Sequence, residues 1–107
     1  MAHTPPYRLI YDTDIPRQLR TIDRKYHTLI RSTIEAQLTY EPNIETTNRK
    51  PLARLVTFHA RWELRFGPHN HFRVYYRTYE DVREVHILAV GVKLRNKVYI
   101  GGEEYDL

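Results

Sequence analysis

An alternating segment from residue 61 to residue 78 most constrains the fold of this 107-residue chain. It reads RWELRFGPHNHFRVYYRT, and apolar residues occupy every second position in each half. Side chains of a β-strand alternate between two faces, so the pattern predicts two strands joined by a short loop. The register that matches the apolar faces pairs Phe66 with Phe72, Leu64 with Val74, and Trp62 with Tyr76. A shift by one residue would set apolar against polar side chains.

The same register places like charges opposite each other on the second face. Its pairs are Arg65 with Arg73, Glu63 with Tyr75, and Arg61 with Arg77. Directly opposed like charges cost some tenths of a kcal/mol, up to about 1 kcal/mol per pair. Two interpretations stay open at this point: the arginines extend into water, or the face binds an anion. Arginine suits phosphate because its planar fork contacts two oxygens at once, and Tyr75 would offer a surface on which a base stacks.

The basic charge of the chain is concentrated around this hairpin. Residues 48–78 carry seven Lys or Arg and one acid, whereas the remaining residues carry ten basic and twelve acidic side chains. The formal net charge is +4. A localised basic patch favours an anionic partner such as nucleic acid, although a solvated basic face is the alternative.

The amino-acid composition excludes several classes of protein. The chain has no cysteine, which excludes disulfides and thiolate metal sites and favours a cytoplasmic protein. No apolar run approaches the roughly 20 residues that span a bilayer, so no membrane association is expected. The length fits a single domain, residues 1–107, with one modest core.

The first half of the chain predicts a strand and then a helical region. YRLIY at 7–11 is rich in β-forming residues, and apolar residues then recur at helical spacing from Ile15 to Leu38. The helical region ends before Pro42, because the residue preceding proline avoids the α conformation. The pattern leaves open whether 15–40 is one helix or a hairpin of two, broken near Asp23. Residues 41–60 lack clean periodicity and predict a long connection.

The last third predicts a central strand and a short tail. Residues 83–93 are apolar on both faces, with Val85, Ile87 and Ala89 set against Leu88, Val90 and Val92, as in a strand covered on both sides. The final residues, NKVYIGGEEYDL, predict a Gly-Gly turn and an acidic tail that frays into solvent.

The order of strand, helical region, long loop and three-stranded meander resembles the RelE/ParE toxin superfamily. The likeness is carried by IPRQLRTIDRKYHTLIRSTIEAQLTYEP, NRKPL, WELRFG followed by FRVYY, and ILAVGVKLRNKVY, and it spans nearly the whole chain. It is greatest to the RelE branch, whose members cut mRNA on the ribosome and are inhibited by a small antitoxin. The resemblance implies an α+β fold in which an N-terminal strand and a helical hairpin accompany a curved antiparallel sheet.

The resemblance also implies a basic site that uses neither a metal nor a cofactor. By matching motifs, Arg65 corresponds to the arginine that contacts the scissile phosphate, Lys93 to the later basic residue and Tyr99 to the tyrosine after it. Lys50 most nearly matches the loop lysines, with Arg49 and Arg54 as neighbours. The sequence departs from the family pattern in having lysine at 93, a single loop lysine and no C-terminal helix.

The implied chemistry is attack of an RNA 2′-OH on the adjacent phosphate. Lys50 or Tyr99 is the candidate base, Arg65 and Arg73 would stabilise the developing charge, and His71 is the candidate acid. Further RNA contacts are expected from the rest of the basic segment, namely Arg49, Arg54, Arg61, Arg73, Tyr75 and Arg77.

The expected partners are an antitoxin, which would convert a monomeric toxin into a hetero-oligomer, and the ribosome with its mRNA. The alternative function is a binding module of the same superfamily without catalysis. Such a module would inhibit DNA gyrase, as the ParE branch does, or act only within an antitoxin-bound repressor complex.

Overall fold

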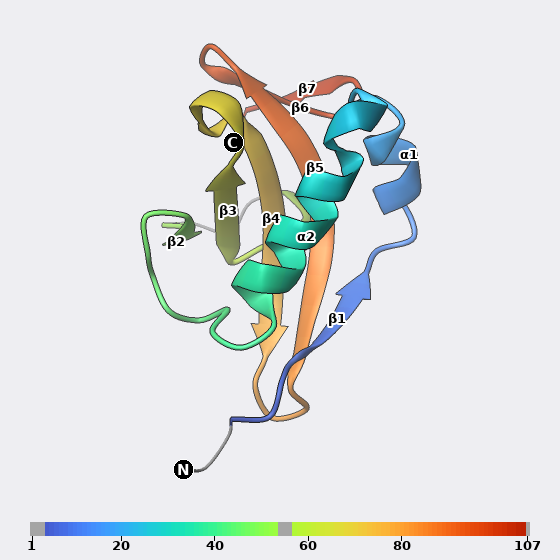
Figure 1. The fold of residues 1–107 in the computed structure, drawn as a ribbon. Helices are drawn as coiled ribbons and strands as arrows, with labels where there is room; N and C mark the ends of the chain where they lie inside the picture. The colour runs from blue at the N-terminus through green and yellow to red at the C-terminus, as the bar shows by residue number, and fades with distance from the viewer. Residues whose placement is uncertain (1–3, 54–56, 107) are drawn as a thin grey trace.

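A computed structural model describes residues 4–53 and 57–106. The first half contains β1 (Arg8–Tyr11), α1 (Ile15–Leu19), the 3₁₀ turn η1 (Arg24–Tyr26), α2 (His27–Leu38) and β2 (Arg49–Pro51). The second half contains η2 (Thr57–His59), β3 (Trp62–Phe66), η3 (Pro68–Asn70), β4 (Phe72–Tyr79), β5 (Glu84–Leu94), β6 (Lys97–Ile100) and β7 (Glu103–Tyr105). Both helices lie on one face of the sheet (Figure 1).

Within the described residues, seven strands form one sheet with β5 at its centre. The strand order is β2-β3-β4-β5-β6-β7, and all of these neighbours are antiparallel. The free edge of β5 is shared, because β1 pairs with its first half in parallel and β6 pairs with its second half. Between these partners the Val90 amide donates to Oε1 of the buried Gln18 of α1 at 2.8 Å. Helix α1 therefore completes the hydrogen bonding of the central strand.

The helical region is divided near Asp23, as the hairpin alternative proposed. Asp23 caps η1 by accepting a hydrogen bond from the Lys25 amide at 3.1 Å. His27 opens α2, and its Nε2 lies 2.8 Å from the Leu19 carbonyl oxygen and 2.9 Å from that of Ile22. These contacts satisfy the carbonyl of the last residue of α1 and one carbonyl of the link that follows, and they fix the path of the chain between the helices.

The main core lies between the helices and the sheet. Its fully buried members from the sheet include the residues that the hairpin register predicted to face inward, Leu64, Phe72, Val74 and Tyr76. From α2 they are Ile30, Ile34 and Leu38, which recur at helical spacing.

A β-bulge changes the expected faces of β5. Tyr75 pairs with Ala89 but the next residue, Tyr76, pairs with Ile87, so Leu88 is the extra residue. Val85, Ile87 and Val90 consequently belong to the main core, whereas Leu88 and Ala89 contact the opposite face. The grouping of Ala89 with Val85 and Ile87 was wrong because strict alternation does not continue through a bulge.

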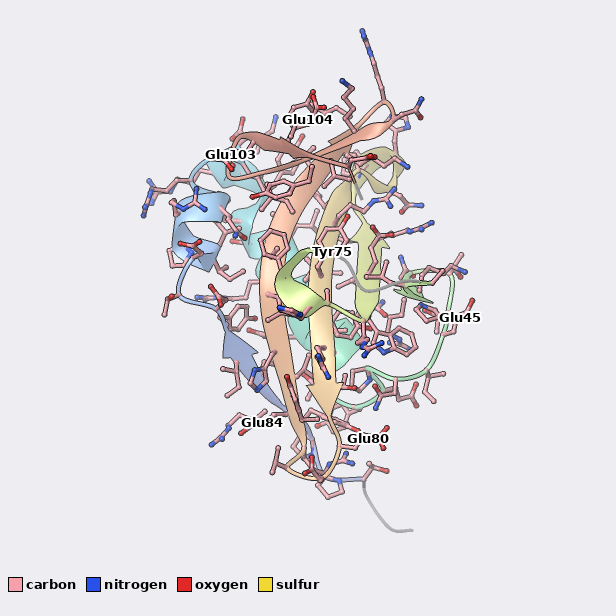
Figure 2. All side chains as sticks on the ribbon, turned by 180° about the vertical axis from the view of Figure 1, so that it is seen from behind. Glu45, Tyr75, Glu80, Glu84, Glu103 and Glu104 are labelled. Carbon is pink, nitrogen blue, oxygen red and sulfur yellow. The ribbon has the colours of Figure 1, made fainter. Side chains whose placement is uncertain are left out.

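A second, smaller core covers part of the face opposite the helices. Its buried members are Ala60, Tyr75, Ala89, Val98 and Ile100, with Leu52, Phe58, Leu88 and Tyr105 packed against them. The η2 turn crosses this face over the middle of the sheet, where Tyr75 is labelled in Figure 2. The connection from 41 to 60 is thus partly ordered, and three of its residues form the edge strand β2.

The C-terminal residues form a strand, which corrects the expectation of a frayed tail. Gly101 and Gly102 adopt φ values of +62° and +83° in a tight hairpin turn, and β7 then pairs with β6. Tyr105 anchors β7 by packing against Phe58, with ring centroids 5.4 Å apart. The predicted Gly-Gly turn is confirmed.

Replacing Gly67 with alanine is expected to destabilise the protein by about 2–3 kcal/mol. Gly67 has φ +83°, and an added Cβ would lie 2.3 Å from Cδ2 of the buried Phe72. Gly102 has the same φ of +83°, but a Cβ there would meet only the Thr21 Cγ2 atom at 3.9 Å. Urea unfolding of Gly67→Ala and Gly102→Ala separates the two effects, because both variants strain the backbone but only Gly67→Ala adds a clash. Equal losses of unfolding free energy in the two variants would show that the clash with Phe72 contributes nothing.

Candidate nucleic-acid interface

The opposed arginines predicted from the sequence are present in the β3–β4 hairpin. Arg65 pairs with Arg73, and Glu63 pairs with Tyr75. The expected opposition of Arg61 and Arg77 lies outside the ladder, because β3 begins at Trp62 and the paired residues end there. The Arg61 side chain is exposed, and its amide donates to the Tyr76 carbonyl at 3.1 Å.

A single carboxylate explains how the two opposed arginines coexist. Oε1 of Glu63 accepts from Nε of Arg65 at 2.6 Å and from Nη1 of Arg73 at 3.1 Å. Glu63 is only 6% exposed and Arg73 only 8% exposed, so their attraction is weakly screened by water. The three groups together carry one net positive charge.

Arg65 is the member of this group that faces solvent. Its side chain is 42% exposed, and its terminal Nη atoms make no hydrogen bond to any described residue. Both polar groups of its backbone are bonded to Asn48, since the Arg65 amide donates to the Asn48 carbonyl and the Arg65 carbonyl accepts from Asn48 Nδ2, each at 2.8 Å. The sheet thus presents a fixed guanidinium with a free outer edge.

Arg73 is not available to RNA in this structure, which corrects its assignment as a phosphate contact. Besides its bond to Glu63, its Nε donates to the Asn70 carbonyl at 3.0 Å in the η3 turn. Burial and two bonds make Arg73 a structural counter-charge.

Two lysines lie on the same face of the sheet as Arg65. Lys50 of β2 is half-buried, sits opposite Glu63 in the register and lies 3.6 Å from the Glu45 carboxylate. Lys93 of β5 follows Gly91, the partner of Arg73, by two residues, and so shares that face. At ordinary sheet spacing its Cα lies roughly 12 Å from that of Arg65. Arg65, Lys50 and Lys93 therefore form a group of cations on the face of the sheet opposite the helices.

Tyr75 is a fully buried member of the second core, so it offers no surface for base stacking. Burial and the neighbouring Glu63 carboxylate raise the pKa of its hydroxyl strongly, which keeps it neutral. The hydroxyl has no hydrogen-bond partner among the residues that the structure describes. The tyrosine was expected to be exposed because the sequence does not reveal that η2 covers it.

Arg49 is likewise buried, which corrects its assignment as an RNA contact. Its Nη1 donates to the Gln37 carbonyl at 2.8 Å and to Gln37 Oε1 at 2.9 Å, and its Nε donates to the Ile44 carbonyl at 2.8 Å. The guanidinium therefore joins the C-terminal turn of α2 to β2.

His71 and Tyr99 lie apart from the arginine face. Both line a hollow of about 270 Å³ beside η1, together with Asp23 and Tyr26. Tyr99 pairs with Val92, whose side chain packs against the main core, and the His71 ring lies 6.5 Å from the Tyr26 ring. The structure thus does not bring the candidate acid and the candidate tyrosine together with Arg65.

The remaining candidates are dispersed. Arg77 is half-buried, and its guanidinium lies over the Tyr79 ring at 5.5 Å, toward the other end of β4. Arg54 lies outside the described residues. Sequence reasoning missed the structural importance of Asn48 and Asn70, and it did not include Glu63 among the candidate site residues. The signal for Glu63 was its position as the sole acid in the basic segment.

The Tyr75→Phe variant is expected to be more stable than the wild-type protein by about 1 kcal/mol, because it removes a buried hydroxyl that has no hydrogen-bond partner among the described residues. Tyr76 provides the matched control on the other face of β4, since its hydroxyl donates to the Pro42 carbonyl at 2.8 Å. Tyr76→Phe should therefore lose about 1 kcal/mol. Thermal unfolding of both variants tests this, and a destabilised Tyr75→Phe would contradict it.

The described residues contain no group of three or more His, Cys, Asp or Glu placed to hold a metal ion. No helix among them is both long and apolar enough to cross a membrane.

Comparison with known proteins identifies the fold. No family model matches the sequence, and no curated protein matches it significantly. A chain from the crystal structure of the toxin–antitoxin complex RelBE2 of Mycobacterium tuberculosis superposes with a TM-score of 0.65 and 24% sequence identity, covering 82% of this chain and 99% of that one. The likeness confirms the expected α+β, RelE-like fold.

Proposed function

We propose that this protein is the toxin of a type II toxin–antitoxin pair and cleaves mRNA on the ribosome. The observation that carries the proposal is Arg65, a fixed guanidinium with a free outer edge on a face that also bears Lys50 and Lys93. The RelE-like fold supports it, since the superposed chain comes from a toxin–antitoxin complex.

In the proposed reaction the RNA 2′-oxygen attacks the adjacent phosphorus and the bond from phosphorus to the 5′-oxygen breaks. The products are a 2′,3′-cyclic phosphate and a 5′-hydroxyl. Arg65 stabilises the negative charge that develops on the phosphate oxygens, and Lys93 neutralises a neighbouring phosphate. Lys50 is the candidate base for the 2′ proton, because it shares the Arg65 face whereas Tyr99 does not.

The 5′-oxygen must receive a proton as it leaves. His71, the candidate acid, lies in the hollow beside η1. We therefore assign the proton donor to solvent or to a group of the ribosome, and we keep His71 as a residue to be tested.

The proposed partner is a small acidic antitoxin that covers the cationic face. An acidic segment would pair with Arg65, Lys50 and Lys93 and so exclude RNA from them.

Inducible expression of this chain alone, followed by mapping of mRNA 5′ ends, tests the proposed function. We expect growth arrest with new 5′ ends inside translated codons. Arrest with intact transcripts and induction of DNA-damage signalling would instead identify a gyrase inhibitor.

A second candidate, a binding module without catalysis, is favoured by one observation. The hollow that holds His71 and Tyr99 is separate from the face that holds Arg65, so the groups expected for proton transfer are not assembled with the phosphate ligand. A purified protein that binds RNA and leaves ribosome-bound mRNA intact would support this candidate.

A further inference from the structure

We propose that Glu63 is a positioning residue, which orients the Arg65 guanidinium toward a substrate phosphate, and that Arg73 is its buried counter-charge. The inference rests on the proposed function and deepens it, because it divides the work of the two opposed arginines. Arg65 contacts the ligand, and Arg73 balances the charge of the Glu63 carboxylate that lies beside Arg65.

The geometry of the Glu63–Arg65 contact leaves the useful edge of the guanidinium free. Glu63 Oε1 accepts from Nε of Arg65 at 2.6 Å, whereas the two Nη atoms bond to no described residue. Arginine binds phosphate through two parallel N–H groups, and the edge between its Nη atoms supplies such a pair. A long, exposed side chain would otherwise sample many rotamers, so fixing Nε holds the guanidinium in the orientation that the reacting phosphate requires.

The environment strengthens this contact. Glu63 is nearly inaccessible, and the fully buried Tyr75 lies directly opposite it on β4. A charge-assisted hydrogen bond in such a site is stronger than one in water. Arg65 is therefore held at its inner end in a dry environment while its outer end meets solvent.

Arg73 offsets the negative charge that the buried Glu63 carboxylate places beside Arg65. A buried carboxylate paired with Arg65 alone would leave no net charge for a phosphate. Arg73, bonded to Glu63 at 3.1 Å and to the Asn70 carbonyl at 3.0 Å, restores a net charge of one. This explains why the hairpin places like charges opposite each other.

The test compares Glu63→Gln with Glu84→Gln. Glu84 is a matched control, since it is also a strand carboxylate bonded to an arginine, Arg8, but lies at the far end of the sheet (Figure 2). A double variant, Glu63→Gln with Arg73→Met, removes both buried charges together and protects the test against loss of folding.

Three measurements are made on each protein: the ¹H–¹⁵N NMR signal of the Arg65 Nε–H group, the Kd for a six-nucleotide single-stranded RNA, and the single-turnover rate of mRNA cleavage on purified ribosomes. In Glu63→Gln and in the double variant, we expect the Nε–H signal to move upfield and broaden. Cleavage should slow by at least about tenfold. RNA should bind Glu63→Gln as tightly as the wild type or more tightly, because a negative charge has been removed.

A general structural role would lower binding and cleavage together, so the split between them identifies positioning. A Glu63→Gln protein that retains both the Nε–H signal and the wild-type cleavage rate would overturn the inference. If the wild-type protein cuts no RNA, the proposed function fails, and the NMR signal still decides: its loss in Glu63→Gln supports the positioning of Arg65, and its retention refutes it.

Discussion

Replacing Arg65 with alanine is expected to lower the rate of mRNA cleavage by about 100- to 1,000-fold, the usual cost of removing one donor that stabilises charge in a transition state. The terminal nitrogens of Arg65 are free of described partners, whereas Arg73 opposite it is bonded to Glu63 and to the Asn70 carbonyl, so Arg73 cannot take its place. Single-turnover cleavage of mRNA on purified ribosomes measures the effect. Arg65→Lys should recover only part of the rate, because an ammonium group cannot supply two parallel N–H groups.

Arg8→Ala is the matched control for this prediction. Arg8 is also a strand arginine bonded to a carboxylate, Glu84, but it is exposed at the opposite end of the sheet. Its loss should leave the cleavage rate unchanged. Comparable losses in both variants would show that general positive charge matters and that Arg65 holds no special position.

Replacing Arg49 with alanine is expected to cost about 3 kcal/mol of stability, although the residue was first assigned to RNA binding. The change removes three hydrogen bonds from a charged group and leaves the Gln37 and Ile44 carbonyls without their donor. It also removes a cation from the C-terminal end of α2, where the helix dipole favours positive charge. Urea unfolding measures the loss.

Arg61→Ala serves as the comparison, since Arg61 is an exposed arginine close to the same edge of the sheet. Its removal should change stability by less than about 0.5 kcal/mol. If Arg49→Ala were equally harmless, the buried network around α2 would not stabilise the fold as argued.

The hairpin and its register could be predicted because both depend on the alternation of apolar and polar residues within the hairpin segment itself. Matching Trp62, Leu64 and Phe66 to the apolar residues of the next strand admits one register, and that register is the observed one. The break at Asp23 was visible as an alternative for the same reason, since a capping side chain acts on its own next turn.

The positions of individual site residues depended on contacts between distant segments, which no local pattern records. Tyr75 is buried because the η2 turn crosses the sheet above it, and Arg49 is buried because it reaches Gln37 of α2. The extra residue Leu88 in the bulge reverses the alternation of faces along β5, so Val90 lies in the main core and Ala89 in the second core. Tyr99 was grouped with Arg65 by family likeness, whereas its pairing with Val92 places it on the other side of the sheet.

The most direct test of the central claim uses an mRNA that carries one 2′-deoxynucleotide immediately 5′ of the mapped cleavage position. The mRNA is placed on purified ribosomes with the wild-type protein. The account predicts that the all-ribose mRNA is cut to leave a 2′,3′-cyclic phosphate and a 5′-hydroxyl, and that the deoxy-substituted mRNA stays intact at that position. Equal cleavage of both, or an all-ribose mRNA that stays uncut, would contradict a ribonuclease that works by 2′-OH attack at Arg65.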